Sequence, residues 1–193
     1  MKKIKYIILI IIIIGLCVGI YLFIKEKSDN KSLDTDKNRQ EEFFDNYHSK
    51  NEGNEKKFIE NKNKLLFDYN KAKKENNETI GAIYIPKTSI MFPIVKHSDN
   101  SYYLTHTFYK NYSIRGAIFM DFNQTFDDLH TMIYGHNLSS GDMFSELTNY
   151  SNLNYAKSHK YVYIWIKEKR HKYEVFSSFV TARTDYETYK IAY

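Results

Sequence analysis

Cysteine, proline and glycine are all scarce in this 193-residue sequence, which contains one, two and seven of them respectively. A single cysteine excludes an intrachain disulfide, and with it the small secreted scaffolds that depend on disulfides. So few prolines and glycines exclude collagen-like and Pro/Gly-rich low-complexity chains. With 42% hydrophobic and 26% charged residues, the composition is that of a folded protein with about one domain.

A strong excess of one charge sign is also absent. The sequence has 28 Lys and Arg against 23 Asp and Glu, and Lys2, Lys3 and Lys5 all precede the first acidic residue, Glu26. Without those three lysines, basic and acidic residues are almost balanced. Because nucleic-acid-binding surfaces are strongly basic, and because no RNA- or DNA-binding motif is present, we expect no nucleic-acid partner.

Metal-binding patterns are missing as well. None of the seven histidines forms an HExxH, HxH or Cys/His zinc pattern, so we expect no metal site and no cofactor. One loop gathers four oxygen-bearing side chains: Asp121, Asn123, Asp127 and Asp128. A Ca²⁺ loop needs ligands at alternate positions, a central Gly and a closing Glu, which this loop lacks. We therefore interpret it as a solvated acidic loop.

The longest apolar run covers residues 6–24, which are 19 residues without a charge. As a helix it would extend roughly 28 Å, close to the hydrocarbon thickness of a bilayer. A cleaved signal peptide is the alternative, but Lys25-Glu26-Lys27 follows in place of a small-residue cleavage site. The run and its flanking lysines predict a single-pass cell-membrane protein, with its N-terminus inside and its C-terminal domain extracellular. Cys17 lies within this run and is interpreted as an apolar filler.

The rest of the chain divides by composition. We predict a cytoplasmic tip over 1–5, a transmembrane signal anchor over 6–24, a linker and helical stalk over 25–78, and a β domain over 79–193. Within the stalk, five apolar residues fall on one helical face, with a break near Gly53: Phe58, Ile59, Leu65, Leu66 and Tyr69. That face either packs on the following domain or binds a partner.

The β domain shows six short runs rich in Ile, Val, Phe and Tyr between turn residues. The expected strands are residues 80–85, 89–95, 116–121, 130–135, 160–167 and 172–181. Lys169-Arg170 is expected to form a hairpin turn, and residues 99–105 and 141–150 are expected to form short helices. Many strands and few helices predict a mainly β fold, a barrel or a sandwich.

His136 is the strongest catalytic candidate. It follows a short apolar run and Gly135, which places it just beyond the end of a predicted strand. A histidine can accept and donate a proton near neutral pH, which suits a general acid/base. The alternative is a histidine that only makes a structural hydrogen bond.

The segment IYGHN at 133–137, followed by GDMF at 141–144, resembles the histidine loop of class B sortases. Further segments stand in the order that the family shows: GAIYIP at 81–86, FPIV at 92–95, DNSYYL at 99–104, GAIFMD at 116–121, KYVY at 160–163 and YEVFS at 173–177. The resemblance covers roughly residues 79–186. It implies a sortase-like antiparallel β-barrel with N-terminal helices.

Class B sortases are cell-surface cysteine transpeptidases of Gram-positive bacteria. The resemblance implies an enzyme that cleaves a C-terminal sorting motif in surface proteins through an acyl-thioester on a cysteine. An amine of a cell-wall precursor, or another amine acceptor, then resolves the thioester. His136 corresponds to the family's acid/base histidine, and four residues are implied to line or support the substrate cleft: Asn137, Asn100, Ser101 and Tyr102. No cofactor is implied.

The sequence departs from the family at the nucleophile. The family's cysteine follows the histidine in a Thr-Leu-x-Thr-Cys motif, and its arginine follows on the next strand. This sequence has no cysteine after Cys17, and its last arginine, Arg183, does not follow such a motif. We therefore expect a C-terminally truncated sortase with an incomplete barrel and no activity as given. The alternative is a non-catalytic, membrane-anchored peptide-binding module.

Overall fold

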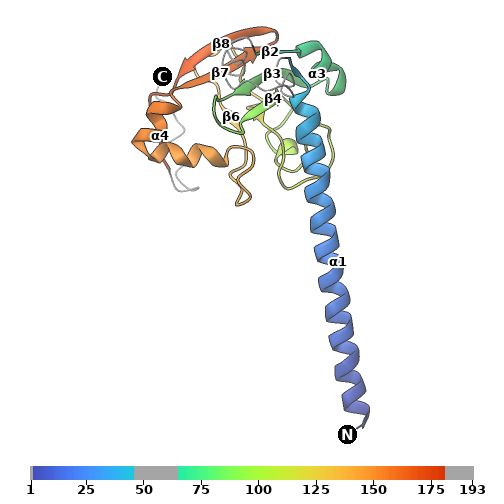
Figure 1. The fold of residues 1–193 in the computed structure, drawn as a ribbon. Coiled ribbons are helices and arrows are strands. Elements are labelled where there is room, and N and C mark those ends of the chain that lie inside the picture. The colour runs from blue at the N-terminus through green and yellow to red at the C-terminus, as the bar shows by residue number, and fades with distance from the viewer. Residues whose placement is uncertain (1, 46–64, 181–193) are drawn as a thin grey trace, which may run out of the picture. The chain divides into compact units, whose positions relative to one another are not determined.

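The computed structural model describes residues 2–45 and 65–180, and the chain separates into two compact units, Met1–Arg39 and Gln40–Tyr193. The first unit is helical and belongs to α1 (Lys2–Glu41), drawn in blue in Figure 1. No proline interrupts this stretch, so its backbone hydrogen bonds can continue from turn to turn. A Cβ added at either of its two glycines, Gly15 or Gly19, would have no heavy atom of the described residues outside its own helix backbone within 4 Å.

The membrane prediction requires a correction. Among helices in the described ranges, none combines the length and the apolar character needed to cross a bilayer. The apolar run 6–24 is part of α1, which continues without a break into charged and polar sequence as far as Glu41. The predicted transmembrane segment over 6–24 is therefore wrong. The predicted location, a single-pass membrane protein with its C-terminal domain extracellular, is wrong with it.

The second unit is built on a sheet with the strand order β6-β5-β4-β3-β7-β8, shown in green to orange in Figure 1. The strands are β3 (Thr79–Tyr84), β4 (Met91–Val95), β5 (Phe119–Met120), β6 (Ile133–Tyr134), β7 (Tyr161–Ile166) and β8 (Lys169–Glu174). All neighbours are antiparallel except β4 and β5, which pair in parallel at Val95 and Phe119. The prediction of a mainly β fold is confirmed, as a curled, barrel-like sheet.

Each of the six predicted strands overlaps an observed one, and β5 and β6 are shorter than predicted. β8 ends at Glu174, so the prediction of a strand over 172–181 is wrong for residues 175–180. The hairpin turn between β7 and β8 lies at Lys167 and Glu168, so its prediction at Lys169-Arg170 is wrong. Lys167 adopts a φ of 55°, which reverses the chain two residues earlier. Lys169 therefore opens β8 and pairs with Ile166.

The segment before the sheet differs from the predicted helical stalk. β1 (Phe44–Asp45) pairs with β2 (Leu66–Phe67), and α3 (Tyr69–Glu75) follows. The side chain of Asp68 caps α3 by accepting the Lys71 N–H at 2.8 Å, so that helix begins there and does not extend backward. The predicted single helical face is therefore wrong for its last three members, Leu65, Leu66 and Tyr69. Phe58, Ile59 and the break near Gly53 lie outside the described residues.

The sheet separates two apolar clusters, because successive side chains of a strand point to opposite faces. On one face, Ala82 and Tyr84 join an aromatic cluster in which Trp165 meets Phe44 edge-on at 5.9 Å. On the other face, Ile83 joins a mainly aliphatic cluster. The aromatic cluster includes residues before position 79, so the second unit begins earlier than the predicted β domain.

Short helices occupy the two long connections, as predicted. They are the 3-10 helices η1 (Tyr102–Leu104) and η2 (Ser145–Ser151), and α4 (Leu153–Ser158) follows η2. The connection from β6 to η2 contributes Met143 to the aliphatic cluster, where it is 8% exposed. That apolar anchor fixes the segment after His136 to the body of the sheet.

Candidate active site

His136 lies two residues beyond the end of β6. Its neighbour Gly135 packs so tightly that an added Cβ would stand 2.5 Å from Cδ1 of Ile118 and 2.7 Å from Cδ2 of Phe144. Any side chain at this position would force one of those groups to move. Gly135 therefore allows the chain to leave the sheet against the aliphatic cluster and to present the next residue, His136.

The imidazole of His136 makes a directed contact with the last residue of η1. Its Nε2 lies 2.8 Å from the carbonyl oxygen of Leu104. A carbonyl oxygen can only accept, so Nε2 carries the hydrogen in this contact. In the neutral ring, the lone pair that accepts a proton is then on Nδ1. The geometry therefore makes Nε2 the hydrogen-bond donor and leaves Nδ1 as the nitrogen that can accept a proton.

Gly116 makes room for this contact. It has a φ of +61°, and a Cβ there would lie 2.3 Å from the Tyr103 carbonyl oxygen and 3.2 Å from Cδ2 of His136. The next residue, Ala117, donates its N–H to that Tyr103 oxygen at 3.0 Å. The end of η1, the backbone before β5 and the imidazole therefore pack directly on one another.

Residues 135–145, which we call the histidine loop, are closed by their own hydrogen bonds. The Phe144 N–H donates to the His136 carbonyl at 2.9 Å, and the Leu138 N–H donates to Ser145 Oγ at 2.7 Å. Gly141 turns the chain with a φ of +84°. These contacts make the loop a compact unit, so a displacement of one part of it carries His136 along.

An ion pair joins this loop to the segment before β5. Nη1 of Arg115 lies 2.7 Å from Oδ2 of Asp142, and the side chains are 17% and 28% exposed. Sequence reasoning missed Arg115, because nothing in a lone arginine before a glycine indicates its partner. The fold alone brings the two residues together.

Asn100, predicted to support the cleft, forms hydrogen bonds through both the oxygen and the nitrogen of its side-chain amide. Its Nδ2 donates to Asp121 Oδ2 at 2.7 Å, and its Oδ1 accepts the Phe122 N–H at 2.9 Å. Burial raises the pKa of Asp121, but hydrogen bonds from the Asn123 backbone, Asn100 and a tyrosine outweigh it and lower that pKa overall. Asn100 thus connects the η1 segment to the end of β5.

Ser101 and Tyr102 are organised by Asp99. Oδ1 of Asp99 accepts hydrogen bonds from the Ser101 hydroxyl at 2.6 Å, the Ser101 N–H at 2.6 Å and the Tyr102 N–H at 2.8 Å. The Ser101 hydroxyl and then the two N–H groups lower the pKa of Asp99 to about 2. The Tyr102 ring stacks between His97 at 4.5 Å and His106 at 4.1 Å.

The contact from His136 into this segment is thus to a backbone carbonyl, whereas Asn100, Ser101 and Tyr102 shape the turn that presents it. Asn137, the remaining predicted residue, is exposed and forms a backbone bridge with Met143 across the histidine loop. Over residues 2–45 and 65–180, no group of three or more metal-ligating side chains is found.

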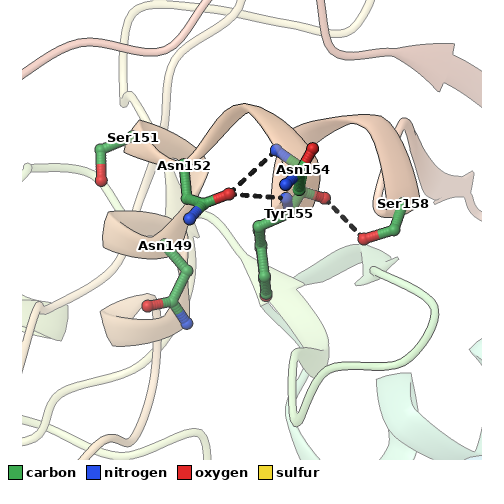
Figure 2. A pocket seen from close by; sticks show the side chains of 6 residues that line it. All are labelled: Asn149, Ser151, Asn152, Asn154, Tyr155 and Ser158. Atoms are coloured by element: carbon green, nitrogen blue, oxygen red, sulfur yellow. Dashed lines mark hydrogen bonds between the residues drawn. The ribbon is translucent and has the colours of Figure 1, made fainter.

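A hollow of about 450 Å³ lies elsewhere in the second unit, on η2 and α4 (Figure 2). Its lining is polar and uncharged: Asn149, Ser151, Asn152, Asn154, Tyr155 and Ser158. Asn152 caps α4 here, because its Oδ1 accepts the N–H groups of Asn154 at 2.9 Å and Tyr155 at 3.2 Å. None of the predicted site residues lines this hollow.

Comparison with known proteins points to one family. The sortase domain family matches residues 83–192. Sortase B of Listeria monocytogenes is 42% identical over 89 residues, which are 45% of this chain and 36% of that protein. The structure of Clostridium perfringens sortase B is 33% identical with a TM-score of 0.54, over 56% of this chain and 60% of that chain.

The structure of a Staphylococcus aureus sortase B–substrate complex is 28% identical with a TM-score of 0.54, over 57% of this chain and 52% of that chain. In length, the chain spans 36% of the Listeria protein and 52% of the S. aureus sortase B sequence. The matched residues contain β4 to β8 and the whole histidine loop.

Proposed function

This chain belongs to the sortase family, and we propose that it represents the histidine-bearing part of a class B cysteine transpeptidase. The proposed reaction cleaves a C-terminal sorting motif in a surface protein and transfers the acyl group to an amine, which belongs to a cell-wall precursor or another acceptor. The likeness to a sortase B solved with its substrate supports a peptide as the ligand.

The contact between His136 Nε2 and the Leu104 carbonyl at 2.8 Å is the observation that carries this proposal. It holds the ring with its protonated nitrogen turned to the protein and leaves Nδ1 as the proton acceptor. In the proposed reaction, Nδ1 exchanges a proton with the nucleophilic thiol and with the leaving amine. The imidazolium form keeps the Leu104 hydrogen bond, so the ring does not need to turn between the two proton transfers.

The nucleophile that the family resemblance implies is a cysteine after the histidine, and this sequence has none there. We propose that the 193-residue chain by itself does not turn over sorting peptides. The Ser140 hydroxyl on the histidine loop is a candidate to replace the thiol as nucleophile. It donates to Asp142 Oδ2 at 3.0 Å and thereby helps to hold the loop. A hydroxyl also needs a stronger base than a thiol does to become a nucleophile.

A chimera tests the role of His136. Residues 1–177 would be joined to the C-terminal segment of a class B sortase that supplies the missing cysteine and arginine. Cleavage of fluorogenic sorting peptides and transfer to an added amine would be measured. We expect His136→Ala to lower kcat/KM about a hundredfold or more, because general acid/base catalysis contributes that much.

His130→Ala is the matched control, since His130 lies on the partly exposed loop before β6 and is expected to leave turnover unchanged. Near-parental turnover of His136→Ala would refute the assignment. A chimera that binds sorting peptides without any turnover would favour a peptide-binding module instead. The unmodified 193-residue chain, assayed in parallel, is expected to show no cleavage above background.

A further inference from the structure

The histidine loop is attached to the segment 102–116 at two places. One is the hydrogen bond from His136 Nε2 to the Leu104 carbonyl, at 2.8 Å. The other is the ion pair from Arg115 Nη1 to Asp142 Oδ2, at 2.7 Å. Both contacts join the same two segments, so the ion pair restrains the histidine loop at Asp142, a second point besides the His136 ring itself.

The Arg115–Asp142 pair is partly sheltered from solvent. Its side chains are 17% and 28% exposed, whereas those of the Lys160–Glu174 pair between β7 and β8 are 47% and 57% exposed at a similar distance of 2.8 Å. Screening by water weakens exposed pairs and acts less on sheltered ones. Of these two pairs, the one beside the candidate active site is therefore the stronger restraint.

Both partners are themselves held in place. Asp142 Oδ2 also accepts the Ser140 hydroxyl at 3.0 Å, and the Asp142 carbonyl accepts the Ser145 N–H at 3.2 Å. The Arg115 N–H donates to Ser113 Oγ at 3.2 Å. The residue after Arg115 is Gly116, where an added Cβ would lie only 3.2 Å from Cδ2 of the His136 ring. Loss of the ion pair is therefore expected to displace the imidazole, because both of the segments that the pair joins also hold the ring.

We propose that Arg115 and Asp142 form a clamp that positions the His136 imidazole. They are positioning residues, because they act through the ring and not on the substrate. Without the clamp, the loop is free to shift, the Leu104 hydrogen bond lengthens, and the ring is no longer held with its proton on Nε2. The relevance of the clamp to catalysis rests on the proposed function, but the coupling of the ion pair to the ring does not.

Nitrogen NMR of the full 193-residue chain, labelled at histidine, tests this coupling. In the parent, the neutral His136 ring is expected to show a protonated Nε2, which donates to the Leu104 carbonyl, and an unprotonated Nδ1. Arg115→Gln and Asp142→Asn are each expected to move both nitrogens toward the average of two tautomers. The Phe144 amide, which bonds the His136 carbonyl, is expected to exchange with solvent about tenfold faster.

Three further variants make the result specific. The double variant Arg115→Gln/Asp142→Asn is expected to differ no more from the parent than either single variant, because each alone already removes the pair. Arg115→Lys keeps a cation and is expected to recover most of the parent tautomer. Glu174→Gln breaks the exposed pair and is expected to leave the His136 signals unchanged. Unchanged signals in both single variants, or additive effects in the double variant, would overturn the clamp.

The chimera separates the clamp from the proposed function. There, Arg115→Gln is expected to lower kcat while KM changes less than twofold, and to shift the pH profile of kcat. If His136→Ala abolishes turnover while Arg115→Gln matches the parent in kcat and in the NMR spectrum, the clamp is wrong and the function stands. If the spectra change as expected but turnover does not depend on His136, the function is wrong and the clamp stands.

Discussion

Gly116→Ala is expected to destabilise the second unit and to disturb the histidine at the same time. Gly116 has a φ of +61°, and an added Cβ would lie 2.3 Å from the Tyr103 carbonyl oxygen and 3.0 Å from that of Leu104. Both neighbours are backbone atoms, so neither can turn away as a flexible side chain would. The end of η1 must move, and it carries the acceptor of the His136 hydrogen bond with it.

The magnitude follows from two separate costs. A left-handed backbone costs an alanine about 1–2 kcal/mol, and forcing an extra carbon into a packed site costs about 1–3 kcal/mol more. Gly141→Ala is the matched control, because Gly141 has a φ of +84° and no atom within 4 Å of the added carbon. We therefore expect a loss of about 2–5 kcal/mol for Gly116→Ala and about 1–2 kcal/mol for Gly141→Ala.

Urea denaturation measures the difference, and the sequence provides its own probe. Trp165 is the single tryptophan and is 1% exposed in the aromatic cluster, so its fluorescence reports the opening of the sheet. Equal losses for the two alanine variants would refute the reasoning, because they would show that the crowded backbone around Gly116 has no cost. Unchanged His136 nitrogen signals in Gly116→Ala would refute the link to the imidazole.

Two further predictions concern local elements. Hydrogen bonds lower the pKa of Asp99 to about 2 and so stabilise its ionised form in the folded chain. This stabilisation is present above the pKa of Asp99 in the unfolded chain and is lost as the pH falls towards 2. In Asp99→Asn, the free energy of unfolding measured with urea should therefore depend less on pH between pH 5 and pH 2 than in the parent. Asp68→Ala removes the cap of α3 and is expected to cost about 1 kcal/mol, with Asp127→Ala on the exposed loop as the control; equal stability of the two variants in thermal melts would contradict the role of the cap.

The strands were predictable because a strand that is buried on both faces appears in the sequence as a continuous apolar run. β3 and β4 are almost wholly buried, and their Ile, Val and Phe residues are visible in the sequence as short apolar runs. The turn at Lys167 was not predictable, since a lysine in the left-handed region leaves no sequence signal of the kind that glycine or asparagine provides. The pairing of β1 with β2 was missed because two-residue strands are too short to show a period.

The candidate site could be predicted from the sequence only where a side chain marks it. His136 stands out as a titratable residue after a strand and a glycine, and the family resemblance rests on the same letters. Its acceptor is the Leu104 carbonyl, and a backbone oxygen leaves no trace in the sequence. Arg115 and Asp142 come together only through the fold, so no local pattern indicates their pairing.

The parallel contact between β4 and β5 has a consequence for the order in which the molecule opens. Its register consists of one residue pair, Val95 with Phe119, whereas β3 pairs with β4 and with β7 along most of its length. The part of the sheet that leads to His136, β5 with β6, is thus joined to β4 by a single residue pair of the backbone register. We expect that part to behave as a separate cooperative unit, whose amides exchange through sub-global opening while those of β3 and β7 remain protected. A bound peptide that contacts both parts of the sheet would connect them and would raise the protection of the β5 and β6 amides from exchange.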